Sequence, residues 1–173
     1  EEANARLLAH AQAYLASIPE AGAPGFSPEN PHGAPWAYFA LGDYVRILCL
    51  FHAGSPHYPG RLSGETETAM KEALWRLVKV GSRVGNASPD SLLVLLGTEN
   101  HDLTRRPNEY LVAAVLKDDP RFRDRRYDDG HTAEEHFQAY NAFFREWPRR
   151  RVASGLWVEI GSDTYQKYSW PAL

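Results

Sequence analysis

The sequence lacks several features that would indicate a particular class of protein. It has one cysteine, Cys49, so it can form neither an internal disulfide nor a zinc site built from cysteines. Its apolar runs are far shorter than the roughly 20 residues that a membrane-spanning helix needs, so we expect no membrane partner. Its formal net charge is -3, without the basic excess typical of nucleic-acid-binding proteins, so we expect no nucleic-acid partner.

Common cofactor and metal motifs are missing as well. The sequence holds no glycine-rich phosphate loop and no Gly-x-Gly-x-x-Gly pattern. His131 and His136 are five positions apart, whereas the zinc motif His-Glu-x-x-His places its histidines four apart. We therefore predict a protein without a cofactor and without a bound metal.

The composition is that of a folded globular chain, with 43% hydrophobic and 24% charged residues among 173. Apolar positions recur with the helical period in several segments, each bounded by proline, glycine or polar residues. This pattern predicts helices over 3–18, 35–52, 65–80, 101–117 and 132–147, and the start of a sixth near Asp163. It leaves 92–96 open between a strand and part of a helix, and predicts a short strand over 156–160 and a solvated loop over 118–131.

The predicted helices alternate at a regular spacing. Odd-numbered helices begin near residues 3, 65 and 132, and even-numbered helices begin near 35, 101 and 163. Repeated helical hairpins of this kind wind either into a solenoid or into a closed α/α toroid. We predict an all-α fold in which residues 1–173 form about three hairpins of a toroid, with the more apolar even helices inside. Because the last helix is predicted to start only ten residues before the final residue, we expect a piece of a longer chain whose remainder completes the toroid.

Parallel inner helices would bring three polar stretches to one face of such a toroid. These stretches precede or open the even helices and hold many of the chemically capable side chains: 29–36, 97–102 and 161–165. Helix N-termini also present N–H groups and positive potential, which favours an anionic ligand. We therefore expect the functional site at this face.

Asn100 and His101 open one predicted inner helix, and Tyr165 opens the next. This arrangement resembles the α/α-toroid polysaccharide lyases, the superfamily of alginate lyases and heparinases, mainly over residues 96–168. The resemblance implies β-elimination of a uronic-acid-containing polysaccharide by a secreted or periplasmic enzyme. That reaction needs a donor for the uronate carboxylate, a base for the C5 proton and an acid for the leaving oxygen at C4.

The resemblance also implies roles for individual residues. Asn100 would donate its amide to the substrate carboxylate, His101 would act as base or help to neutralise that carboxylate, and Tyr165 would supply the acid. Tyr168 lies three residues further along the same helical face and is the alternative to Tyr165. A tyrosine that acts as base needs a nearby cation, because its ordinary pKa is about 10. The sequence leaves open which of five arginines points inward: Arg105, Arg106, Arg149, Arg150 or Arg151.

Binding of an anionic polysaccharide is predicted to involve five side chains: Trp36, Glu99, Arg105, Trp157 and Tyr168. Flat aromatic rings suit stacking on the faces of sugar rings. Glu99 is unusual at this place, because a carboxylate beside the neutralising residue repels an anionic substrate. It therefore either points away or is protonated and donates a hydrogen bond.

Two other functions remain open at the level of sequence. A toroidal glycoside hydrolase needs two carboxylates about 5 to 9.5 Å apart. The carboxylates available for that role are Asp43, Glu99, Asp102, Glu159 and Asp163. A non-catalytic helical repeat that binds another protein would use Asn100 and its neighbours only to cap helices.

Overall fold

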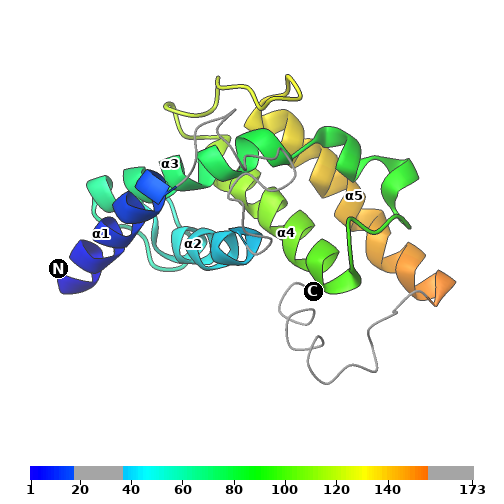
Figure 1. Cartoon of the computed structure of the whole chain (residues 1–173), viewed down its shortest axis with the longest axis horizontal. Helices are drawn as coiled ribbons and strands as arrows, with labels where there is room; N and C mark the ends of the chain where they lie inside the picture. Colours follow the sequence, from blue (N-terminus) through cyan, green and yellow to red (C-terminus); the bar gives the residue numbers. More distant parts are fainter. Residues whose placement is uncertain (18–36, 156–173) are drawn as a thin grey trace. The chain divides into compact units, whose positions relative to one another are not determined.

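The computed structural model describes residues 1–17 and 37–155, and these residues form an all-α protein (Figure 1). The prediction of an all-α fold is confirmed, whereas the toroid stays a prediction. The described helices are α1 (Glu2–Ser17), α2 (Ala37–Phe51), α3 (Gly64–Gly81), the short 3-10 helices η1 (Val84–Ala87) and η2 (Pro89–Ser91), α4 (Glu99–Leu116) and α5 (Ala133–Ser154). None of the helices in this part of the chain combines the length and the hydrophobicity needed to cross a membrane. The predicted strand over 156–160 and the helix near Asp163 lie outside the described residues.

The chain divides into two compact units, residues 1–81 and 82–173. In the first unit, α3 packs against both α1 and α2. Its buried face carries Met70 and Leu74, and α2 contributes Val45 and Leu48. These positions are spaced three or four residues apart, so each helix buries one apolar stripe, as the sequence pattern predicts.

In the second unit, α4 and α5 lie side by side and run in opposite directions (Figure 1). The start of α4 meets the end of α5, and residues near the middle of α4 meet the first half of α5. The core between them includes Leu103 from α4 and three aromatic side chains from α5: Tyr140, Phe143 and Trp147. The antiparallel pair therefore places the first turn of α4 beside the last turns of α5.

Three details differ from the sequence predictions. Residues 92–96 form neither a strand nor part of a helix, but a turn and irregular chain between η2 and α4. The segment 118–131 is only partly solvated, because Phe122 and Tyr127 are 1% and 3% exposed. Helix α5 continues seven residues beyond the predicted end at Trp147, through Pro148, and ends at Gly155 in the left-handed conformation with φ 63°. The additional turn carries the buried Arg151.

Helix α5 begins with a capping box. The backbone N–H of Glu135 donates to the Thr132 hydroxyl, and the backbone N–H of Thr132 donates to the Glu135 carboxylate. We expect Thr132→Ala to lower the free energy of unfolding by about 1 kcal/mol, because the helix loses its N-cap. Thr132→Ser keeps the capping oxygen and is the matched control. The measurement is denaturant unfolding of both variants. Equal stability of Thr132→Ala and Thr132→Ser would contradict a role of the Thr132 hydroxyl as N-cap.

Candidate functional site

The segment that leads into α4 is held by side chains of the helix itself. The backbone N–H of Leu96 donates to the Asp102 carboxylate at 3.1 Å. The Arg106 guanidinium donates to the carbonyl of Val94 at 2.9 Å and to that of Ser91 at 3.3 Å. Gly97 then turns the chain with φ +89°, a conformation that a residue with a side chain rarely adopts. The chain before Gly97 is therefore held against α4 by Asp102 and Arg106.

A buried cluster of four charges underlies the first turns of α4. Arg151 from α5 lies 3.5 Å from the Glu99 carboxylate and 3.8 Å from that of Asp102. Arg106 lies 3.1 Å from Asp102, and all four side chains are only 1–3% exposed. Burial raises the pKa of Asp102 and lowers the pKa of Arg106, and the attraction between the two residues opposes both shifts. The two arginines and two carboxylates give the cluster a formal net charge of zero. This matters because a buried charge without a partner is strongly destabilising.

This cluster answers the question of which arginines point inward. Arg106 and Arg151 are buried, whereas Arg149 and Arg150 are exposed. Arg105, which was predicted to bind substrate, donates to the Glu109 carboxylate at 2.9 Å. The helical spacing of Glu99, Asp102 and Arg106 could have indicated one charged face of α4. No local signal connects that face to Arg151, which lies 52 positions from Glu99.

The structure describes four of the predicted site residues, all on α4. Glu99 is buried against Arg151, so its charge is compensated and it does not face an open site as a bare carboxylate. Asn100 is also buried, and its side-chain oxygen accepts a hydrogen bond from the Thr98 hydroxyl. His101 is partly exposed and follows these two residues in the first turn. Arg105, one turn further on, is the fourth. The remaining predicted residues lie outside the described residues: Trp36, Trp157, Tyr165 and Tyr168.

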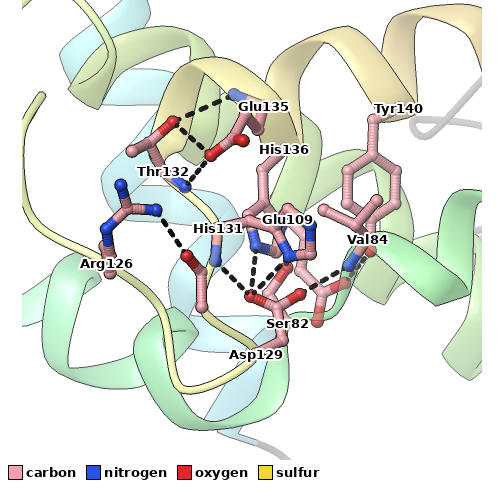
Figure 2. Close-up of polar contacts among 11 residues, drawn as sticks. Ser82, Val84, Glu109, Arg126, Asp129, His131, Thr132, Glu135, His136 and Tyr140 are labelled. Atoms are coloured by element: carbon pink, nitrogen blue, oxygen red, sulfur yellow. Dashed lines mark hydrogen bonds and ion pairs between the residues drawn. The ribbon is translucent and has the colours of Figure 1, made fainter.

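A second polar group, which the sequence analysis missed, lies near the first turn of α5 (Figure 2). His136 is fully buried, with its Nδ1 atom 3.2 Å from the Ser82 hydroxyl and its Nε2 atom 3.2 Å from the Asp129 carboxylate. The Asp129 carboxylate accepts hydrogen bonds, so Nε2 carries the ring hydrogen and Nδ1 accepts from Ser82. The Tyr140 phenol donates its hydrogen to the Glu109 carboxylate.

The order serine, histidine, aspartate is that of a nucleophilic triad, but this arrangement does not suit nucleophilic catalysis. Ser82 is 1% exposed, so its hydroxyl does not meet a substrate. The hydroxyl also donates its hydrogen to the His136 ring. Burial lowers the pKa of His136 and outweighs the opposing effect of Asp129. The chain of hydrogen bonds therefore joins segments of the fold rather than activating a nucleophile.

Only the turn at 97–102 carries predicted catalytic residues within the described chain, and of its two such residues only His101 is accessible. In the same part of the chain, no group of three or more His, Cys, Asp or Glu side chains is placed to hold a metal ion. The candidate site is therefore the start of α4, where His101 is the partly exposed residue. No family model, no curated protein and no solved structure matches this chain.

Proposed function

We propose that this chain belongs to a carbohydrate-active enzyme, a lyase that cleaves a uronic-acid-containing polysaccharide by β-elimination. The observation that carries the proposal is the placement of His101. Its partly exposed imidazole stands in the first turn of α4, between residues that are buried and fixed by the charge cluster. A base held on such a support loses little conformational freedom when it meets substrate.

The surroundings of His101 suit an anionic sugar. The first turn of α4 presents backbone N–H groups and the positive end of the helix dipole, which attract a uronate carboxylate. Glu99 would oppose this attraction if it were bare, but Arg151 lies 3.5 Å from its carboxylate. Because the buried cluster is neutral as a whole, the Glu99 carboxylate is expected to repel an anionic substrate only weakly.

The proposed reaction moves one proton to the protein and one from it. His101 removes the proton from C5, and the electron pair of that bond forms the double bond between C4 and C5. The bond between C4 and the glycosidic oxygen breaks, and an acid protonates that oxygen. Tyr165 is the proposed acid and Tyr168 its alternative, and Trp36 and Trp157 are proposed to stack on sugar rings. We propose an α/α toroid as the complete fold, and a secreted or periplasmic location where such polymers are found.

A hydrolytic function receives less support from the described residues. Glu99 and Asp102 are the two α4 carboxylates that could form a hydrolase pair. Both are buried and both lie within 4 Å of Arg151. A general acid needs a raised pKa and access to the leaving oxygen, and these two residues have no access.

The proposal is tested by digestion of several polysaccharides. Alginate, hyaluronan and heparan sulfate supply uronates, and a neutral glucan is the control. We expect at least one uronate polymer to give new reducing ends together with ultraviolet absorbance from the C4–C5 double bond. Reducing ends without that absorbance would indicate hydrolysis instead. Binding without either product would overturn the proposal in favour of a non-catalytic module.

A further inference from the structure

His136 connects three separate segments of the second unit (Figure 2). The residue itself belongs to α5, and its ring contacts Ser82, which precedes η1, and Asp129, which belongs to the segment 118–131. It makes these contacts with no exposed surface. The His136 imidazole thus joins α5 to Ser82, which lies 54 positions earlier in the chain, and to Asp129, which lies seven positions earlier.

Asp129 is the other half of this junction. Its carboxylate accepts hydrogen bonds from the backbone N–H of Val84 at 2.8 Å and from that of His131 at 3.1 Å. The carboxylate also contacts two histidine rings, His136 at 3.2 Å and His131 at 3.4 Å. Burial by itself would raise the pKa of Asp129, but these N–H groups outweigh it and hold the pKa below its ordinary value. Asp129 therefore stays ionised and ties the segment 118–131 to both η1 and α5.

Other side chains complete the surroundings of the imidazole. Tyr127 stacks on it, with ring centroids 3.8 Å apart, and Tyr140 of α5 lies on a nearly parallel plane at 6.5 Å. Glu109 is the charged group that faces it from α4, through Tyr140, and Glu109 is itself paired with Arg105. The His131 ring lies edge-on at 6.3 Å. Asp129 and Glu109 favour a protonated His136, whereas burial and His131 oppose it.

We propose that His136 is a pH-sensitive latch whose protonation releases the segment 118–131 from α5 and η1. In the closed arrangement the Nδ1 atom accepts a hydrogen from Ser82. Protonation of Nδ1 turns that acceptor into a donor, so the Ser82 hydroxyl has to rotate, and it places a positive charge where no water reaches. Opening of the segment hydrates the imidazolium and exposes the Tyr127 ring that covers it. This inference is independent of the proposed lyase activity.

The direction of the pH effect follows from the lowered pKa of His136. The open form binds a proton near the ordinary histidine pKa of about 6.5, while the closed form binds it only at lower pH. The closed form therefore has its full stability above about pH 6.5 and loses it as the pH falls through the pKa of the closed form. Within that window the opening equilibrium increases about tenfold per pH unit, because one proton is taken up on opening.

Hydrogen exchange of the full chain, measured by mass spectrometry between pH 7.5 and 5 and corrected for intrinsic rates, tests the latch. We expect the protection of 118–131, which includes the hydrogen bond from the Tyr127 N–H to the His131 carbonyl, to fall about tenfold per pH unit below pH 6.5. His136→Gln keeps a donor towards Asp129 but does not titrate, so its protection should not depend on pH in this range. His57→Gln, which changes an exposed histidine of the first unit, is the control and should keep the wild-type dependence.

Two results would overturn the proposal. One is protection of 118–131 that stays constant in the wild-type protein across this range. The other is a wild-type dependence in His136→Gln. If that variant fails to fold, nuclear magnetic resonance of the wild-type histidine rings replaces it. The His136 ring should then titrate together with the loss of protection, and a separate midpoint would reject the latch.

Discussion

Replacement of Arg151 by methionine is expected to lower the free energy of unfolding of the second unit by about 3–5 kcal/mol. The methionine fills much of the space of the arginine stem but leaves Glu99 without the arginine it faces and removes one of the two arginines near Asp102. A buried carboxylate without a compensating charge either stays ionised at high cost or takes up a proton. The variant should therefore also lose less stability at acidic pH than at neutral pH.

The measurement is denaturant unfolding, monitored through a signal that reports on the second unit. Arg150→Met is the matched control, because Arg150 is the exposed neighbour in the same helix and should change stability by less than about 0.5 kcal/mol. A second variant, in which Glu99→Gln is combined with Arg151→Met, removes one of the stranded charges. It should recover part of the loss. Equal stability of the Arg151 and Arg150 variants would show that the buried cluster contributes nothing.

Replacement of His101 by glutamine is expected to reduce the rate of β-elimination by about 10²–10⁴-fold. Glutamine keeps hydrogen-bonding capacity but cannot remove the C5 proton at neutral pH. Because His101 is partly exposed, the loss of its ring should leave the fold almost unchanged. The measurement is the initial rate of ultraviolet absorbance on the polymer that the wild-type protein cleaves.

The control for this variant is His57→Gln, which changes an exposed histidine in the other unit. It should retain the wild-type rate. If His101→Gln remained fully active while folded, His101 would not be the base, and Tyr165 would have to serve as both base and acid. If its thermal unfolding midpoint also fell by many degrees, the rate loss would reflect unfolding rather than missing chemistry.

The helices were predictable from local patterns, and two of their ends differ from the prediction. The start of α4 was predicted at His101, and it lies two residues earlier at Glu99, with Thr98 as an extended N-cap residue. Helix α5 was expected to stop before Pro148, since a proline inside a helix costs about 3 kcal/mol. The helix continues through Pro148, and its additional turn carries Arg151, which contacts Glu99 and Asp102. No pattern within α5 reveals that contact.

The candidate site divides in the same way. Asn100 and His101 were found from their own sequence, because a polar pair at a helix start is a local signal. The charge cluster and the His136 junction were missed, because their partners are 52 and 54 positions apart. Such pairs exist only once α5 has packed against α4 and against the segment that holds Ser82. Each member looks like an ordinary surface residue when the sequence is considered alone.

The polar contacts between α4 and α5 also determine how these helices can move. Glu99 meets Arg151 at one end, and Glu109 meets Tyr140 further along. A slide of α5 by one turn, about 5.4 Å, would separate both pairs at once and leave buried charges opposite apolar rings. Shear between packed helices is a common way for proteins to change shape. In this pair, both polar contacts form in only one alignment of the two helices. The first turn of α4 is therefore expected to stay beside the end of α5 when other parts of the chain move.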